Sequence, residues 1–229
     1  MSIVATTDLK RVYESGATEV KAVNGVSLNI EAGEFAVLAG PSGSGKTTLL
    51  NLIGGLDRPT HGSVQLDGEL LNDKSDDELT RARLFKIGFI FQAYNLVPVL
   101  SAYENVQFIL QIQGVPDSEH EKRIMPLFEE LGLSGLAHRL PGELSGGQQQ
   151  RVAVARAIVG HPSIILADEP TANLDSESAV ALLNLMHRLN LEQKVTFLFS
   201  SHDSKVIDIA QRVISMRDGK ISDDIRKPQ

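Results

Sequence analysis

The stretch FAVLAGPSGSGKTT, residues 35–48, decides the fold. It begins with a short apolar run, continues into a loop with three glycines, and leads into apolar residues at helical spacing, Leu49, Leu52 and Ile53. That order predicts a buried strand, a glycine-rich loop and an amphipathic helix. Because strands alternate with helices along much of the chain, the sequence predicts an α/β fold with a largely parallel sheet.

The loop matches the pattern G-x-x-x-x-G-K-S/T from Gly40 to Thr47, which is typical of phosphate-binding loops. Backbone N–H groups converge on phosphate oxygens only where no Cβ intrudes, so Gly43 and Gly45 permit the curl, and the helix N-terminus adds its dipole. Lys46 is expected to hold the β- and γ-phosphates and Thr47 to ligate Mg²⁺. A plain glycine turn before a helix is the alternative. The candidate phosphate-binding residues are Gly40, Pro41, Ser42, Gly43, Ser44, Gly45, Lys46, Thr47 and Thr48.

The composition limits the possible functions. The chain has 229 residues, 42% of them hydrophobic, which is enough for a sizeable core. A formal charge of -7 argues against broad adhesion to nucleic acid or anionic lipid. Cysteine is absent, which disfavours a disulfide scaffold and favours a reducing cytosol. The longest apolar runs fall far short of the ~20 residues that cross a bilayer, so we expect no direct membrane insertion. From the negative charge we expect no nucleic-acid partner.

The remaining chain is expected to form further strands and helices. Ile3 to Ile30 predicts two or three antiparallel strands with turns at Ser15-Gly16 and Asn24-Gly25, and Asp67-Gly68 predicts another turn. Helices are expected over 76–84, 101–113, 119–131, 145–159 and 176–190. Strands are expected over 87–91, 163–167 and 195–199, followed by a short helix and two final strands.

Two carboxylates close the apolar strand that ends at Ala167. Asp168 and Glu169 follow it directly, at the end of a parallel strand where ligands of open α/β sheets bind. Strand alternation predicts that their side chains point in opposite directions. Asp168 is expected to hold Mg²⁺ and Glu169 to orient or deprotonate a water for attack on the γ-phosphate. A solvated acidic turn is the alternative.

The pentapeptide LSGGQ, residues 144–148, predicts a helix start with Ser145 as N-cap and a buried stripe behind it at Val152, Ala155 and Val159. Together with the two preceding motifs, it makes the chain similar to the nucleotide-binding subunit of an ABC transporter. In that family this helix start faces the ATP of another protomer. The resemblance therefore implies a second ATPase copy, ATP and Mg²⁺ as ligands, and active hydrolysis.

The resemblance covers about residues 3–222 and implies a P-loop NTPase fold of the ABC ATPase type. This fold combines a mixed, mostly parallel sheet with an N-terminal antiparallel β subdomain and an inserted helical subdomain. Residues 1–229 are then a single domain, in which 1–92 and 160–229 form the nucleotide-binding core and 93–159 the helical part.

The resemblance also assigns roles to residues outside the phosphate loop. Tyr13 falls where the family keeps an aromatic residue that stacks on adenine, although an ordinary strand aromatic is the alternative. Gln92 matches the glutamine that senses Mg²⁺ and the γ-phosphate, and His202 matches the histidine that contacts the γ-phosphate. Asp175 belongs to a loop that crosses the dimer interface, and a helix cap explains it equally well. The full expected sets are Lys46, Gln92, Glu169 and His202 for catalysis; Thr47, Gln92 and Asp168 for the metal; and Tyr13, Ser145, Gly147, Gln148 and Asp175 as further nucleotide contacts.

Departures from the family pattern are small, such as Ser201 where threonine often precedes the histidine. Within the family, the segment from Ser75 to Val106 is similar to the MacB/LolD type, which serves lipoprotein release or macrolide and peptide export. This implies a permease partner of the MacB, LolC/LolE or FtsX type, with the chain held peripherally at the cytoplasmic face of a bacterial inner membrane. An FtsE-like ATPase that regulates cell-wall hydrolases through its membrane partner is the alternative, and a soluble ABC protein acting on DNA or ribosomes is a weaker one.

Docking of the permease is expected near Gln92 and over residues 93–113. Tyr94 to Leu100 form an apolar cluster in this segment, apart from Asn95. Such a cluster is typical of a contact surface, and a buried part of the core explains it equally well.

Overall fold

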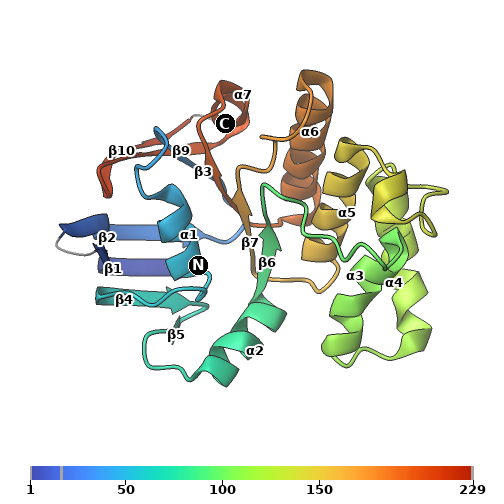
Figure 1. The fold of residues 1–229 in the computed structure, drawn as a ribbon, viewed down its shortest axis with the longest axis horizontal. Helices are drawn as coiled ribbons and strands as arrows, with labels where there is room; N and C mark the ends of the chain where they lie inside the picture. The colour runs from blue at the N-terminus through green and yellow to red at the C-terminus, as the bar shows by residue number, and fades with distance from the viewer. Residues whose placement is uncertain (1, 16–17, 228–229) are drawn as a thin grey trace.

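The computed structural model describes residues 2–15 and 18–227, which form two β-sheets flanked by helices (Figure 1). The strands are β1 (Ser2–Ser15), β2 (Thr18–Glu31), β3 (Phe35–Ala39), β4 (His61–Leu66), β5 (Glu69–Leu70), β6 (Ile87–Ile90), β7 (Ile164–Asp168), β8 (Phe197–Ser201), β9 (Arg212–Arg217) and β10 (Lys220–Arg226). The helices are α1 (Lys46–Ile53), α2 (Asp76–Lys86), α3 (Ala102–Ile112), α4 (Asp117–Glu130), η1 (Pro141–Glu143), α5 (Gly146–Ile158), α6 (Ser176–Gln193) and α7 (Ser204–Ile209).

The first sheet is antiparallel, in the order β2-β1-β4-β5. The predicted turn at Asp67-Gly68 joins β4 to β5, with both residues at positive φ. The predicted turn at Asn24-Gly25 is wrong, because both residues lie inside β2. On β1, Leu9 pairs with Val26 and the next residue, Lys10, pairs with Asn24, so Gly25 on β2 has no partner and forms a β-bulge at φ 82°. The Ile3 to Ile30 region therefore holds two strands, and the other predicted turn, Ser15-Gly16, reaches outside the described residues.

The second sheet has six strands in the order β10-β9-β3-β8-β7-β6, and every neighbouring pair is parallel except β10 with β9. This mixed, mostly parallel sheet lies between the antiparallel sheet and the helices α3 to α5 (Figure 1). The predicted fold class is thus confirmed. The carboxyl ends of β3, β7 and β8 reach the same edge of the sheet, which brings the phosphate loop and the two carboxylates together.

The central strands are apolar throughout because both faces of the sheet are buried. Alternate residues of β3 enter different cores: Phe35 and Val37 contact the core beneath the helices, whereas Ala36 and Leu38 contact the core beneath the antiparallel sheet and α1. All four side chains have no exposed surface. Burial on both faces fixes the register of β3 and, with it, the position of the loop that follows.

Helices α3, α4 and α5 lie together at the right of Figure 1. The starts of α2, α3 and α5 are each fixed by a capping box. The hydroxyl of a serine accepts from the backbone N–H of the third helical residue, and the side chain of that residue accepts from the backbone N–H of the serine. The predicted N-cap at Ser145 and the buried stripe of Val152, Ala155 and Val159 are both observed. On the part of the chain that the structure describes, no helix is both long and apolar enough to cross a membrane.

The predicted helices and strands differ from the observed ones mainly at their ends. Helix α6 continues three residues beyond the expected 176–190, to Gln193, and the strand expected over 195–199 lies two residues later, as β8 from Phe197 to Ser201. Val195 and Thr196 precede it, and the two serines at its end are part of the sheet. The reason is register: β8 pairs with β7 from Ile165 onward, and the pairing continues to Asp168 opposite Ser200.

Candidate active site

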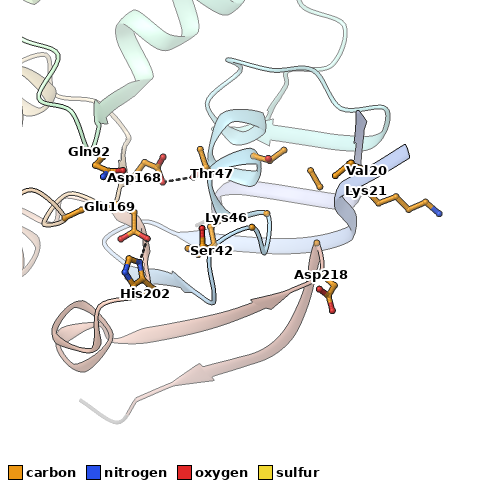
Figure 2. A pocket seen from close by; sticks show the side chains of 16 residues that line it. Val20, Lys21, Ser42, Lys46, Thr47, Gln92, Asp168, Glu169, His202 and Asp218 are labelled. Carbon is orange, nitrogen blue, oxygen red and sulfur yellow. Dashed lines mark hydrogen bonds and ion pairs between the residues drawn. The ribbon is translucent and has the colours of Figure 1, made fainter. Parts of the chain in front are cut away.

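A cavity of about 750 Å³ opens where the phosphate loop, β7 and β8 end. Figure 2 shows it between the β1–β2 hairpin on one side and Gln92, Glu169 and His202 on the other. Ten of the residues predicted from the sequence line it: Ser42, Gly43, Gly45, Lys46, Thr47, Thr48, Gln92, Asp168, Glu169 and His202. The fold therefore gathers segments that lie more than one hundred positions apart in the chain.

Glycine is required in the loop for two different reasons. At Gly43 the backbone has φ 79°, a conformation that other residues rarely adopt, and the space beside it is open. At Gly45 the backbone has φ 100°, and a Cβ would lie 2.1 Å from the carbonyl oxygen of Ala22 on β2. The loop therefore needs glycine at position 43 for its backbone conformation, and at position 45 also because the loop lies close to β2.

Several groups of the loop suit an anionic ligand. The N-terminus of α1 has no side-chain cap, so its first backbone N–H groups are open to phosphate oxygens. Lys46 Nζ donates to the carbonyl oxygens of Gly40 and Pro41, at 2.8 and 3.1 Å, which keeps its charge on the loop. The Ser44 hydroxyl is buried without a hydrogen-bond partner among the described residues. These residues fit a phosphate chain.

Thr47 and Asp168 provide oxygen ligands of the kind Mg²⁺ prefers. The Thr47 hydroxyl donates to Asp168 Oδ1 at 3.0 Å, and the Ser200 hydroxyl donates to the same oxygen. In the described part of the chain, no group of three or more histidine or carboxylate side chains forms a metal site. One carboxylate and one hydroxyl beside a phosphate loop match the usual magnesium arrangement, in which phosphates and water complete the coordination.

The backbone of Glu169 leaves the strand geometry. Its φ is 45°, and its N–H still bonds to the carbonyl oxygen of Ser200 at 3.0 Å. Asp168 and Glu169 both line the same cavity. The expectation that their side chains point in opposite directions stays a prediction. Glu169 Oε1 lies 2.8 Å from Nδ1 of His202, and its Oε2 accepts from Ser201.

Gln92 lies just after β6, on the same side of the cavity as Asp168 and Glu169 (Figure 2). Its carbonyl oxygen accepts a hydrogen bond of 2.9 Å from the amide of Asn173, in the loop that precedes α6. The carbonyls of Tyr94 and Asn95, a little further along, accept from the guanidinium of Arg156 on α5. Burial lowers the pKa of Arg156 from its ordinary value. The loop after β6 is thus attached both to α5 and to the segment that follows Glu169.

Four predicted nucleotide contacts lie at helix starts and do not line this cavity: Ser145, Gly147, Gln148 and Asp175. Ser145 and Gln148 form the capping box of α5. Asp175 caps α6 by accepting from two backbone N–H groups, and hydrogen bonds from Ser178 lower its pKa. Both cap interpretations made from the sequence are confirmed, while their nucleotide roles stay predictions.

Tyr13 also lies outside the cavity lining. Its hydroxyl donates to Asp57 at 2.6 Å, and the guanidinium of Arg11 lies 4.6 Å from the ring centroid. Its register partner on β2, Val20, does line the cavity. The ring is therefore held at the rim by two neighbours, and its stacking on adenine stays a prediction.

Sequence reasoning missed part of the lining. The additional residues are Val20, Lys21, Ala22, Ala172, Asp218 and Gly219. Gly219 lies in the β9–β10 turn; its N–H donates to the Ser44 carbonyl, and its own carbonyl accepts from Asn24. The dipeptide Asp218-Gly219 is typical of a turn, but the local sequence does not show that the pairing of β9 with β3 brings this turn to the phosphate loop.

Comparisons with known proteins agree with this geometry. A family model for ABC transporters matches residues 23–172, more than half of the chain. A macrolide export ATP-binding/permease protein MacB from Hyphomonas neptunium is 49% identical over 97% of this chain, which spans only 34% of that protein. An ABC transporter ATP-binding protein from Methanocaldococcus jannaschii is 44% identical, with 93% of both chains covered.

A solved dimeric structure of this Methanocaldococcus cassette, in a post-hydrolysis state with ADP and Pi, is similar over 99% of both chains. The TM-score is 0.90 at 41% sequence identity. The similarity therefore includes the phosphate loop, both carboxylates and the helix that begins after Ser145. This chain belongs to the ABC transporter ATP-binding family, and it binds and hydrolyses ATP.

Proposed function

We propose that two copies of this chain close on two Mg-ATP molecules, hydrolyse them and reopen, and that this cycle drives a separate membrane permease. Lys46 and the loop N–H groups hold the phosphates. Glu169 orients and deprotonates the water that attacks the γ-phosphate, and His202 supports Glu169 and contacts the γ-phosphate. Thr47, Gln92 and Asp168 hold the metal, which supplies neutralisation of charge at the phosphate oxygens. Catalysis is then positioning and charge stabilisation.

One observation carries the two-copy proposal. The cavity of a single chain contains the phosphate loop, both carboxylates and His202, yet it contains none of Ser145, Gly147 and Gln148. The capping box of α5 uses the backbone N–H groups of Ser145 and Gln148, and the other N–H groups of this helix start form an anion site that this cavity does not use. The structure of the Methanocaldococcus relative is dimeric with ADP and Pi bound, which supports an assembly of two copies. In our proposal the helix start of one copy contacts the ATP of the other.

The absence of cysteine makes crosslinking a clean test of this arrangement. In a Glu169→Gln background, Ser42→Cys and Ser145→Cys are combined and treated with a short thiol crosslinker. We expect a covalent dimer in the presence of Mg-ATP and far less without nucleotide. Each single-cysteine chain is the control and forms no such product. A crosslink that forms only within one chain contradicts the composite site.

A second cavity, of about 510 Å³, supports a permease partner. It follows the free edge of β6 between α2, α3 and α5, and its lining is largely apolar; it includes Leu56, Phe89, Phe91, Phe108, Ile109 and Ile112. Phe108 and Ile112 are about half exposed, which is unusual for such side chains. The groove begins beside the loop of Gln92, so an apolar permease segment seated there would contact the loop that lines the active site.

The test replaces both groove residues, as Phe108→Asp with Ile112→Asp. We expect loss of co-purification with the permease while basal ATP hydrolysis persists. Phe85→Asp is the matched control, since Phe85 is an exposed phenylalanine of α2 outside the groove lining. Glu104 is unsuitable for charge reversal because its carboxylate accepts from the backbone N–H of Ser101 and lies in the capping box of α3. Retained binding by the double variant contradicts docking at this groove.

We further propose a task of the MacB type, in which the permease extrudes or releases its cargo while this chain lies at the cytoplasmic face of the membrane. The support is the 49% identity to the Hyphomonas MacB protein. The chain spans about a third of that relative's length, and the assay combines this chain with a permease protein. Reconstituted vesicles with both proteins are expected to show ATP-dependent cargo movement. ATP hydrolysis with activation of a cell-wall hydrolase and no cargo movement would favour the FtsE-like alternative.

A further inference from the structure

Two serines end β8, and neither has any exposed surface. A buried hydroxyl is costly unless it has a partner, so a pair of them at the end of a central strand needs an explanation. Each bonds a different functional carboxylate: Ser200 donates to Asp168, and Ser201 donates to Glu169. Packing alone does not require a hydroxyl at either position, because alanine would fit the same strand positions.

The contacts of Asp168 are uneven. Its Oδ1 accepts from both Ser200 and Thr47, whereas no donor among the described residues bonds its Oδ2. Asp168 and Ser200 are register partners on β7 and β8, so the serine hydroxyl reaches the carboxylate from a fixed neighbouring strand. The terminal torsion of an aspartate is otherwise broad. Two donors on one oxygen therefore fix the rotation of the carboxylate and leave the other oxygen available.

Ser201 is held differently. Its hydroxyl accepts from the backbone N–H of Asp203 at 3.1 Å and donates to Glu169 Oε2 at 3.3 Å. The other oxygen of Glu169 faces His202. Asp203 is the N-cap of α7, so Ser201 connects Glu169 to the start of that helix. The carboxylate that we assign to water activation is thus oriented by one group on each oxygen.

We propose that Ser200 is a positioning residue for the Mg²⁺ site and that Ser201 is a positioning residue for Glu169. The two adjacent hydroxyls then control separate properties: Ser200 the affinity for the metal, and Ser201 the rate of hydrolysis. Groups that orient a metal-binding side chain typically change metal affinity by 10–100-fold when removed. This inference rests on the proposed assignment of Mg²⁺ to Thr47 and Asp168.

The first test uses Ser200→Ala and measures Mn²⁺ binding to the ADP complex by electron paramagnetic resonance. We expect the dissociation constant for Mn²⁺ to rise about 10-fold, while the affinity for ADP in EDTA stays unchanged. Ser200→Thr, which keeps the hydroxyl, is expected to restore Mn²⁺ affinity. Unchanged Mn²⁺ binding in Ser200→Ala overturns the proposal, as does an equal loss of ADP affinity with and without metal, which indicates only a structural role.

The second test uses Ser201→Ala. We expect kcat to fall roughly 10-fold, as loss of one hydrogen bond to a charged group implies, with Mn²⁺ affinity unchanged. A fall in metal affinity equal to that of Ser200→Ala overturns the separation of roles. Ser163→Ala is the matched control for both tests, because Ser163 donates to Asp67 at 2.6 Å and neither residue lines the cavity. A similar loss in that variant also overturns the proposal.

Asp168→Asn separates this inference from the assignment on which it rests. If Asp168→Asn leaves Mn²⁺ binding unchanged, the metal assignment is wrong and the role of Ser200 fails with it. If Asp168→Asn weakens Mn²⁺ binding and Ser200→Ala does not, only the role of Ser200 is overturned. Urea unfolding of each variant verifies that the fold is retained, and Ser200→Thr provides a second folded variant for the comparison.

Discussion

His202 Nδ1 lies 2.8 Å from Oε1 of Glu169, across the ends of two neighbouring parallel strands. A carboxylate oxygen accepts hydrogen bonds, so this contact is a hydrogen bond in the tautomer that carries the proton on Nδ1. The Glu169 carboxylate is bonded on its second oxygen by Ser201. This pair is therefore oriented before nucleotide binds.

Glu169→Gln removes the proposed base but keeps nearly the same shape. Turnover is expected to fall by roughly 10²–10⁴-fold, the range for loss of a general base, because the amide does not accept a proton from water. ATP affinity is expected to change little. Steady-state phosphate release and equilibrium binding of a fluorescent ATP analogue measure the two quantities. A variant with full activity would contradict the role of Glu169.

His202→Ala removes the partner of Glu169 Oε1 and the side chain that we propose contacts the γ-phosphate. We expect a loss of turnover of about 100-fold, at the low end for a group that assists proton transfer. His61→Ala is the control, because His61 pairs with Asp8 on the exposed surface of the antiparallel sheet. Equal turnover rates in His202→Ala and His61→Ala would contradict a role of His202 in ATP hydrolysis.

Gly45→Ala is expected to be more harmful than Gly43→Ala. Both need a left-handed backbone, which costs roughly 1–2 kcal/mol for a residue with Cβ. At Gly45 the new Cβ also meets the Ala22 carbonyl at 2.1 Å, whereas nothing lies within 4 Å at Gly43. Free energies of unfolding from urea titrations test the difference. Equal stabilities would mean that the contact of the loop with β2 is not rigid.

Arg212 gives a pH-dependent contribution to stability. It is a buried guanidinium that bonds both carboxylate oxygens of Asp224, at 2.8 and 2.7 Å, and these bonds lower the pKa of Asp224 below its ordinary 3.8. A lowered folded pKa means that the stabilisation is present above 3.8 and is lost as the pH falls through the folded value.

The difference in unfolding free energy between the natural chain and Asp224→Asn is therefore expected to be constant from pH 7 to pH 5 and to shrink below 3.8. Urea unfolding at several pH values measures it. Asp223→Asn is the control, since its carboxylate has no bond to Arg212. A difference that grows as the pH falls would contradict the lowered pKa of Asp224.

Much of the fold follows from local pattern. The apolar β3, the glycine loop and the stripe on α5 each specify their structure through burial and spacing within a short segment. Asn24-Gly25 misleads because the same dipeptide suits a hairpin turn and a bulge, and only pairing with β1 decides between them.

The less predictable parts of the site depend on pairing between distant segments. Ser200 and Ser201 are polar residues after an apolar run, so locally they resemble a loop. Pairing with β7 makes them the buried end of a strand, where they bond the two carboxylates. The position of Tyr13 likewise depends on Asp57, which lies 44 positions away.

The composite two-chain site is tested by the molecular mass of Glu169→Gln with Mg-ATP, measured by light scattering. We expect a particle of about twice 24.9 kDa with ATP bound and a 24.9 kDa particle without nucleotide. Adding Gly147→Glu, which places a charge at the start of α5, is expected to keep the single-chain mass. A chain that binds ATP fully and stays at 24.9 kDa would contradict the two-chain site.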